Sequence, residues 1–180
     1  MRAVVVYESM YGNTRQIAEQ IGEGLRGLGD VKVIPVGPEA VSAVRSAALL
    51  VVGGPTHVHG MSSKRSRQAA IDNAGASNLT IDPHAGPFGL RELLERIGTV
   101  EATAAAAFDT RIDLNPVVTG RASRGIGRRL RRHGYDLVVP PESFLVDKAN
   151  RLIDGELQRA MAWAEGVAAA FDRYEHRDAA

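Results

Sequence analysis

The sequence has no cysteine and no long apolar run, and each absence excludes a class of protein. Without cysteine there are no disulfides, no thiolate metal sites and no cysteine nucleophile, which fits a cytoplasmic protein. No apolar stretch approaches the roughly 20 residues that a membrane-spanning helix needs, so we expect no membrane span. No charged-then-apolar segment of the kind that directs secretion opens the chain, and we expect no such signal.

Net charge is nearly absent as well. The chain carries 22 basic and 21 acidic residues, which leaves +1 at pH 7. Such a balance creates no global field that attracts nucleic acid, so we expect no nucleic-acid partner. The 180 residues are 44% hydrophobic and 24% charged, which is typical of a globular protein, and they predict a single domain over 1–180.

Apolar runs and amphipathic segments alternate along the chain. The unbroken run 47–52 is typical of a parallel strand buried on both faces, whereas 14–28 repeats its apolar residues at helical spacing. Ala104–Phe108 contains four alanines, which favour helix, but its place in the alternation predicts a strand. We expect strands at 2–7, 31–36, 47–52, 104–108 and 137–146 (the last interrupted by Pro140-Pro141), and helices at 14–28, 39–45, 62–73, 89–97, 121–132 and 154–174.

This alternation predicts an α/β fold with one doubly wound, five-stranded parallel sheet and helices on both faces. In such a sheet, ligands bind at the carboxyl ends of the strands, near the point where the strand order reverses. The loops that leave the strands are therefore where a functional site is expected.

The first such loop is Glu8-Ser9-Met10-Tyr11-Gly12-Asn13-Thr14. It leads straight into a helix, whose N-terminus offers unpaired N–H groups and the positive end of the helix dipole to an anion. Gly12 permits close approach or a positive φ, and the Ser9 and Thr14 hydroxyls can donate to phosphate oxygens. The loop has no lysine, so a Walker-type triphosphate site is not expected, and a single phosphate fits better. The alternative is a well-capped helix start without a ligand.

The loop resembles the FMN-phosphate loop of the flavodoxin-like family, a Ser/Thr-x-Ser/Thr-Gly-x-Thr pattern, although Tyr11 replaces the usual small hydroxyl residue. The resemblance implies a sheet with strand order 2-1-3-4-5. It also implies noncovalent binding of FMN, with this part of the site formed by Ser9, Met10, Tyr11, Gly12, Asn13 and Thr14.

The second loop follows the third expected strand and resembles the loop that wraps the isoalloxazine ring in flavodoxin-like quinone reductases. The resemblance assigns to the FMN site the residues Pro55, Thr56, His57, Val58, His59 and Gly60. His57 or His59 would stack on the ring or hydrogen-bond to it; the alternative is a turn with two surface histidines. These two histidines lack an evident third ligand, so we expect no metal.

The third loop follows the fourth expected strand and comprises Phe108, Asp109, Thr110 and Arg111. By the same resemblance, Phe108 or a backbone amide contacts the ring, and Arg111 places positive charge near the reduced flavin, which favours its anionic form. The alternative for Asp109 and Arg111 is a solvated ion pair. Flavodoxin carriers usually hold the ring between Trp and Tyr, but the only tryptophan here is Trp163 in the last helix.

Three other segments of the sequence resemble binding motifs. The segment 22–27 spells G-x-G-x-x-G but falls inside the first helix, so we interpret it as chance. The segment 119–127 resembles the nucleotide loop of short-chain dehydrogenases, but it has one residue too many and too little chain follows it. The arginine-rich helix 121–132 is interpreted as a solvated face, the alternative being a docking patch for an acidic partner or for nicotinamide-cofactor phosphates.

The resemblance implies a protein that carries electrons through FMN to a redox partner protein or to a small-molecule acceptor such as a quinone. Carrier flavodoxins tend to be acidic, and this chain is not, so an FMN-dependent NAD(P)H:quinone reductase is an alternative. A flavin-free binding or regulatory domain and a phosphate-binding regulator are the others. No residue has the pattern of an acid–base catalyst, and both a monomer and a homodimer remain open.

Overall fold

The computed structural model describes residues 2–57, 59–75 and 78–178. Its strands are β1 (Ala3–Tyr7), β2 (Val31–Pro35), β3 (Leu49–His57), β4 (Gly60–Met61), β5 (Thr103–Ile112), β6 (Tyr135–Leu137) and β7 (Glu142–Val146). Its helices are α1 (Asn13–Gly24), α2 (Ala40–Arg45), α3 (Lys64–Asn73), α4 (Leu90–Arg96), α5 (Pro116–Thr119), α6 (Ala122–Arg132) and α7 (Glu156–Asp178), with a 3₁₀ turn at Arg26–Leu28 after α1.

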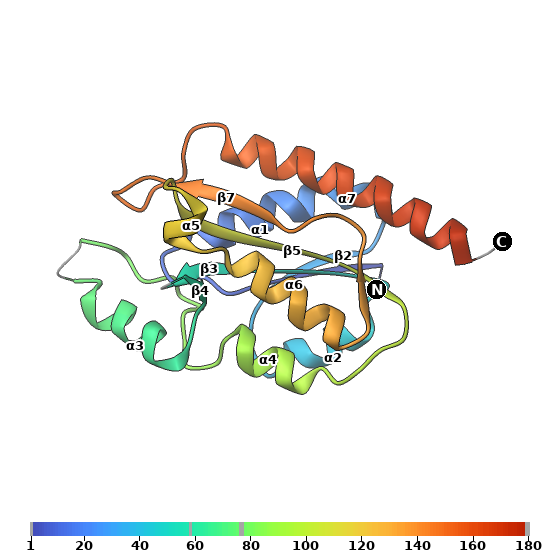
Figure 1. The fold of residues 1–180 in the computed structure, drawn as a ribbon, viewed down its shortest axis with the longest axis horizontal. Coiled ribbons are helices and arrows are strands. Elements are labelled where there is room, and N and C mark those ends of the chain that lie inside the picture. The colour runs from blue at the N-terminus through green and yellow to red at the C-terminus, as the bar shows by residue number, and fades with distance from the viewer. Residues whose placement is uncertain (1, 58, 76–77, 179–180) are drawn as a thin grey trace.

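The sheet is parallel in the order β2-β1-β3-β5-β6, which confirms the predicted α/β fold (Figure 1). The fifth position is shared by two short strands, because β6 pairs with the first residues of β5 and β7 with its last residues. The predicted interruption at Pro140-Pro141 lies between them. A proline lacks the N–H that a sheet ladder needs, which accounts for the break. The two-residue strand β4, antiparallel to the end of β3, was not predicted.

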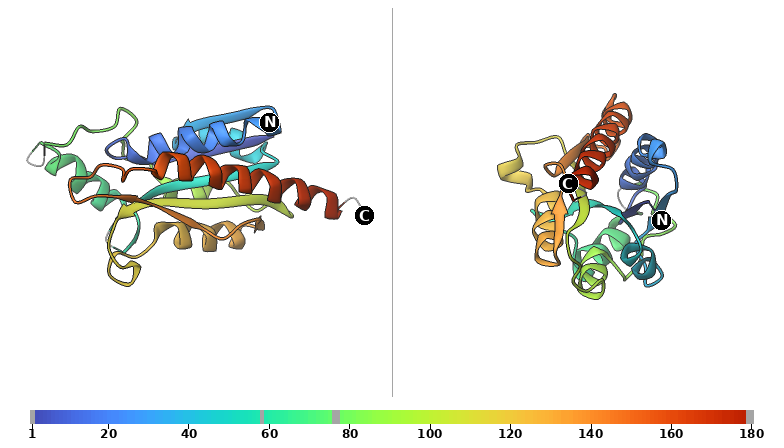
Figure 2. Two further views of the ribbon diagram at one scale, coloured as in Figure 1. Left: turned by 90° about the horizontal axis from the view of Figure 1, so that it is seen from above. Right: turned by 90° about the vertical axis from the view of Figure 1, so that its right-hand side faces the viewer.

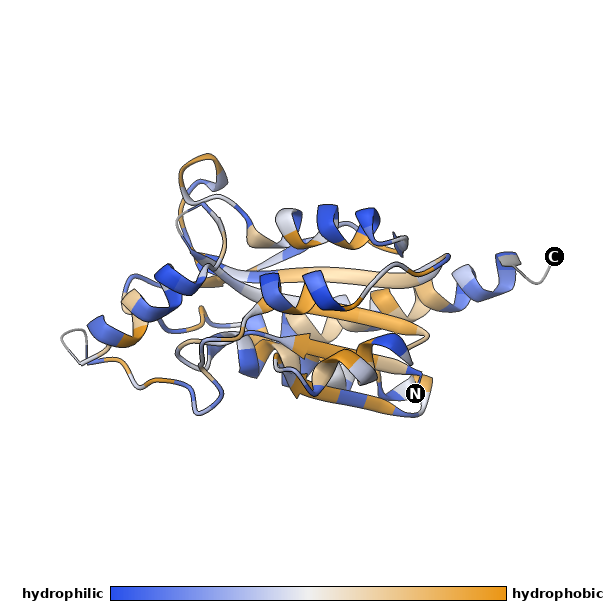
Figure 3. Cartoon of the chain, turned by 90° about the horizontal axis from the view of Figure 1, so that it is seen from below, coloured by the Kyte–Doolittle hydropathy of each residue, from blue (hydrophilic) through white to orange (hydrophobic). Residues whose placement is uncertain are grey.

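Alternate residues of the central strands serve two cores, one on each face of the sheet. On one face, Val4, Leu50 and Ala105 lie in a cluster with side chains of α2, α4 and α6. On the other, Val5 and Val51 lie in a cluster with side chains of α1 and α7. Figure 2 shows these two helical layers on either side of the sheet, and Figure 3 shows the apolar strands between them. Burial on both faces explains why the strands read as unbroken apolar runs.

Two strands are longer than predicted. β3 continues past Gly53 to His57, and β5 continues past Phe108 to Ile112, so that Asp109–Arg111 lies in a strand and not in a loop. The two extensions pair with each other, Gly53 opposite Phe108. A Cβ on Gly53 would collide with the Phe108 ring. The glycine therefore makes room for an aromatic neighbour in the sheet instead of ending the strand.

Two of the three glycines of the G-x-G-x-x-G segment, Gly22 and Gly24, also have a packing role. A Cβ on Gly24 would lie 2.7 Å from the Met161 carbonyl oxygen of α7, and one on Gly22 would collide with Val33 of β2. These residues let α1 approach its neighbours closely, which supports the interpretation that the segment is no nucleotide loop.

Candidate functional site

A cavity of about 250 Å³ lies at the carboxyl ends of β1, β3 and β5. It brings together segments that are far apart in the sequence, and its lining is Ser9, Met10, Tyr11, Asn13, Thr14, Pro55, Thr56, His57, Thr110, Arg111, Ile112, Val146, Asp147, Lys148 and Asn150. Residues from all three predicted loops are thus found at one place. This is the edge of a parallel sheet where ligands generally bind.

The first loop leaves the N-terminus of α1 open. Gly12 precedes the helix with a φ of 89°, and among the described residues no side chain caps the helix and no acidic residue lies in its first turn. The Ser9 Oγ accepts a hydrogen bond from the Gly12 N–H at 3.0 Å, and the hydroxyls of Thr14 and Thr110 are 2.7 Å apart. The first-turn N–H groups are therefore available to an anion, beside two hydroxyl side chains.

Two buried donors that line the cavity have no acceptor among the described residues: Arg111 Nε and Asn150 Nδ2. Arg111 is held in place by its Nη1, which donates to the backbone oxygens of Ile112 and Leu114 at 3.1 and 2.7 Å. A buried donor without an acceptor costs about 1–3 kcal/mol. A ligand with oxygen or nitrogen acceptors at this place would remove that cost.

The second loop contributes Pro55, Thr56 and His57 to the cavity. Burial and then the positive charge of Arg67 lower the pKa of His57 below its ordinary value of 6.5, so its imidazole is neutral at pH 7. His59 is exposed with a φ of 70°, and neither it nor Gly60 lines the cavity. Val58 lies outside the described residues.

The third predicted loop is divided between cavity and core. Thr110 and Arg111 line the cavity, but the Phe108 side chain is fully buried, edge-on to Phe144 at 6.1 Å between ring centroids. Asp109 is also fully buried, and its Oδ2 accepts a hydrogen bond from the Ser123 N–H at 2.7 Å. The side chains of Phe108 and Asp109 therefore do not line the cavity, in contrast to those of Thr110 and Arg111.

The burial of these two side chains follows from strand alternation. Phe108 faces the α1–α7 core, where it packs against Phe144 and Trp163, and Trp163 is likewise occupied by that packing. Asp109 points to the opposite face, where it caps the first turn of α6, and burial raises the pKa of its carboxyl. The aromatic side chain at the cavity is Tyr11, with the imidazole of His57 beside it.

The comparisons with known proteins agree with this architecture. Residues 5–93, from β1 into α4, match the flavodoxin family. A flavodoxin from the domain Archaea superposes with a TM-score of 0.65 at 22% identity, over 96% of this chain and 99% of its own. A flavodoxin, WrbA-like protein from Agrobacterium tumefaciens gives 0.64 at 18% identity, over 96% and 98%. Flavodoxin 1 from Bacillus cereus gives 0.64 at 17% identity, again over 96% and 98%.

The chain has a flavodoxin-like fold. At these identities the solved structures establish the fold, while the family match covers the first and second loops. No curated protein matches the sequence. Over the described residues, no helix is long and apolar enough to cross a membrane, and no three His, Asp or Glu side chains are grouped to hold a metal ion.

One part of the candidate site, which the sequence patterns did not predict, follows the fifth strand. Val146, Asp147, Lys148 and Asn150 line the cavity from the end of β7 and the turn after it. The turn is closed by Asp147, which accepts hydrogen bonds from the backbone and side chain of Arg151; these bonds lower the pKa of the Asp147 carboxyl. The general rule that strand ends share one edge of the sheet could have included this turn.

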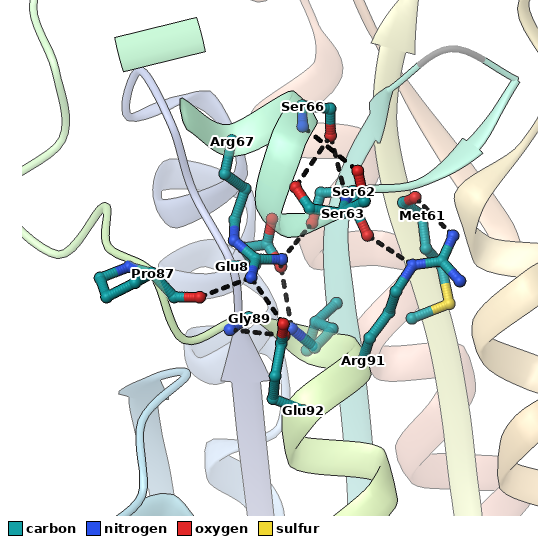
Figure 4. Close-up of polar contacts among 11 residues, drawn as sticks. Glu8, Met61, Ser62, Ser63, Ser66, Arg67, Pro87, Gly89, Arg91 and Glu92 are labelled. Carbon is teal, nitrogen blue, oxygen red and sulfur yellow. Dashed lines mark hydrogen bonds and ion pairs between the residues drawn. The ribbon is translucent and has the colours of Figure 1, made fainter. Parts of the chain in front are cut away.

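The second missed feature is a buried charge network behind the first loop, shown in Figure 4. Glu8 and Arg67 are 3% and 1% exposed, and Glu8 Oε2 lies 3.9 Å from Arg67 Nη1. Arg67 Nη2 also donates to Glu92 Oε1 at 2.9 Å and to the Pro87 backbone oxygen at 2.6 Å. Glu8 Oε2 accepts from the Leu90 N–H at 2.9 Å, and burial raises the pKa of the Glu8 carboxyl.

This network joins the end of β1 to α3 and to the start of α4. Glu8 is the residue immediately before Ser9, so the network fixes the chain where the first loop begins. Arg67 lies 59 positions further on, and neither residue belongs to a local motif, which is why sequence reasoning passed over them. The network positions the loop without itself lining the cavity.

Proposed function

We propose that this flavodoxin-like protein binds FMN noncovalently in the cavity and carries electrons through it. The observation that carries the proposal is a pair of buried, unpartnered donors, Arg111 Nε and Asn150 Nδ2, in residues that line a cavity at the open N-terminus of α1. Buried polar groups are normally satisfied, so donors left open at one cavity favour a ligand rich in acceptors.

The residues present fit that cofactor. The first-turn N–H groups of α1, with the hydroxyls of Ser9 and Thr14, suit a single phosphate, and the loop offers no lysine for a longer phosphate chain. Arg111 and Asn150 suit the acceptor atoms of the rest of the molecule. FMN would supply reversible electron transfer, which the side chains of the chain do not supply themselves. The charge of Arg111 would favour a negatively charged reduced form.

The electrons pass to a partner protein or to a small molecule. A specific observation favours the second of these, that is, an FMN-dependent NAD(P)H:quinone reductase: a larger cavity adjoins the first, and Tyr11 and His57 line both. The net charge of +1 also agrees with a small-molecule partner, because it provides no strong field to steer a charged protein.

The test is a visible absorbance spectrum of the purified protein, followed by a titration with FMN monitored by quenching of flavin fluorescence. We expect flavin absorbance or saturable quenching at one site per chain. Arg128→Ala, an exposed change on α6 far from the cavity lining, serves as the matched control and should bind FMN as the wild type does. A colourless protein that ignores added FMN would favour the flavin-free binding domain and overturn the proposal.

A further inference from the structure

The larger cavity lies on the other side of Tyr11 and His57. It measures about 690 Å³, within the range of cavities that hold small ligands. Its lining comes from the first two loops, the β4 end, α3 and α4, and consists of Tyr11, His57, Met61, Ser63, Arg65, Ser66, Ala69, Ala70, Asn73 and Arg91. We call it the α3 cavity.

Most polar side chains of the α3 cavity are already engaged within the protein. Ser63 and Ser66 bond to each other's backbone N–H in a capping box at the start of α3. The Asn73 amide donates to the Ala69 backbone oxygen at 2.7 Å, and the Tyr11 hydroxyl donates to the Ala70 backbone oxygen at 2.8 Å. These groups form the wall of the cavity, and the charged residues are the ones that remain available to bind a ligand.

Two arginines of the α3 cavity, Arg65 and Arg91, form no ion pair with a carboxylate of the described residues. Arg91 is fixed by two backbone oxygens, through Nε to Ser62 at 2.6 Å and through Nη2 to Met61 at 2.9 Å (Figure 4). Arg65 is exposed and makes no hydrogen bond or ion pair with any described residue. Arg67, on the same helix, is by contrast paired with Glu8 and Glu92.

The surroundings of Arg91 add further positive charge. Arg129 of α6 donates to the Met61 sulfur at 3.4 Å, and its pKa is lowered by burial and then by the charges of Arg91, Arg132 and Arg128. Glu95 is the acidic group that opposes this effect on Arg129. Cations that are held in place beside a cavity and repel one another are stabilised by a bound anion. This stabilisation is larger than for a solvated arginine on the surface.

We propose that the α3 cavity binds a planar aromatic small molecule with an anionic group, next to the FMN site. Tyr11, His57 and Met61 supply ring and thioether surfaces for the planar part, and Arg65 and Arg91 hold the anion. The inference rests on the proposed function, whose electron donor or acceptor it describes. Two sources share this chemistry: a quinone with an acidic substituent, and a nicotinamide dinucleotide with its pyrophosphate.

The test is calorimetric titration of the purified protein with anthraquinone-2-sulfonate, and in a second arm with NADH, each with and without saturating FMN. We expect saturable binding of at least one probe in the presence of FMN, and the arm that binds distinguishes the two sources. The neutral 2-(hydroxymethyl)anthraquinone should bind at least tenfold more weakly than the sulfonate, because a hydrogen-bonded charge contributes about 1.5–3 kcal/mol.

Arg65→Glu should weaken probe binding by about tenfold or more, again from the loss of a charge-assisted contact. Lys64→Glu is the matched control: it makes the same change of charge one residue earlier on α3, but Lys64 does not line the α3 cavity, so probe binding should change little. Because the Arg65 side chain is exposed and has no hydrogen bond or ion pair with a described residue, its variant should keep the wild-type stability.

Equal effects of the two variants, or no binding of either probe, would overturn the inference. So would competition between the probe and FMN, which would show that both cavities form one flavin site. FMN binding is measured separately by fluorescence quenching on the same variants and should not depend on Arg65. Loss of FMN binding with intact probe binding would therefore contradict the proposed function. Loss of probe binding with intact FMN binding would contradict only the proposal for the α3 cavity.

Discussion

The first loop separates two groups of polar side chains that differ in how they are paired. Behind the loop, the buried charge of Arg67 meets the carboxylates of Glu8 and Glu92, although Arg67 Nε and Glu8 Oε1 make no hydrogen bond among the described residues. On the cavity side, Arg111 and Asn150 line the cavity, and their buried Nε and Nδ2 have no acceptor among the described residues.

This difference indicates what each group is for. Charges that are matched within the chain fix its conformation, and their removal is expected to lower stability. Buried donors without an acceptor destabilise the ligand-free protein, so their removal is not expected to lower stability and is expected to lower the affinity for a ligand instead. Both groups consist of polar residues, so residue type does not distinguish them. Whether a group is paired in the tertiary structure indicates its role.

The largest expected effect is on the paired side. Arg67→Met should lower the free energy of unfolding by ~3–5 kcal/mol, because it leaves the buried Glu8 without its cation. Urea denaturation followed by circular dichroism measures this. Arg65→Met, an exposed neighbour on α3, should stay within ~0.5 kcal/mol of the wild type. Similar losses from both variants would contradict the distinction between a paired and an unpaired arginine.

The next largest effect is expected on the open side. The double variant Ser9→Ala/Thr14→Ala should weaken FMN binding by about 10- to 100-fold. The reason is that each hydroxyl is expected to contribute part of the free energy of a hydrogen bond to a charged phosphate. Fluorescence quenching gives the dissociation constants, and Arg128→Ala should leave them unchanged. If the double variant binds FMN as tightly as the wild type, the phosphate does not lie at the first loop.

A pH dependence should distinguish the two groups further. Burial raises the pKa of Glu8 above its ordinary value of 4.5, so the folded protein binds more protons than the unfolded chain between these two pKa values. The stability that comes from protonated Glu8 is therefore complete below the unfolded pKa and is lost as pH rises through the folded pKa. Glu8→Gln should remove this decline, as measured by urea denaturation at a series of pH values. A wild-type stability that rises relative to Glu8→Gln over this window would show that the Arg67 charge outweighs burial.

The smallest stability effect is expected at Asn150, whose φ of 58° suits glycine. Asn150→Gly removes the buried, unpartnered Nδ2 and should not lower the free energy of unfolding by more than ~0.5 kcal/mol. FMN binding should nevertheless weaken by about threefold to tenfold if this donor meets the ligand. A variant with unchanged FMN affinity would remove Asn150 from the proposed site, while leaving the first loop in place.

Much of the fold followed from local patterns. The apolar runs predicted β1, β3 and β5, even where alanines in β5 favour helix, because a strand buried on both faces is apolar throughout. Pro140-Pro141 predicted the interruption of the fifth strand, because proline cannot donate to a ladder. The first loop was predicted from its hydroxyls and glycine at the start of a helix, and the structure places it at the cavity.

What sequence reasoning misassigned depended on partners distant in the chain. Gly53 looked like the end of a strand, but the Phe108 ring occupies the space that its missing side chain leaves. Phe108 and Asp109 looked like loop residues, but pairing with β3 and β7 extends β5 through them and turns both side chains into the two cores.

The sequence by itself therefore determined the order of strands and helices, the hydroxyl- and glycine-containing loop after β1 and the near-neutral charge, because these depend on residue type and short-range spacing. The tertiary structure decided which polar groups are paired within the protein and which remain without a partner. Arg67 is matched by carboxylates from 59 positions before and 25 positions after it, whereas Arg65, Arg91 and Arg111 meet none within the described part of the chain. An arginine's role depends on whether folding brings a carboxylate within reach of its charge, and that proximity is set by the packing of the whole chain.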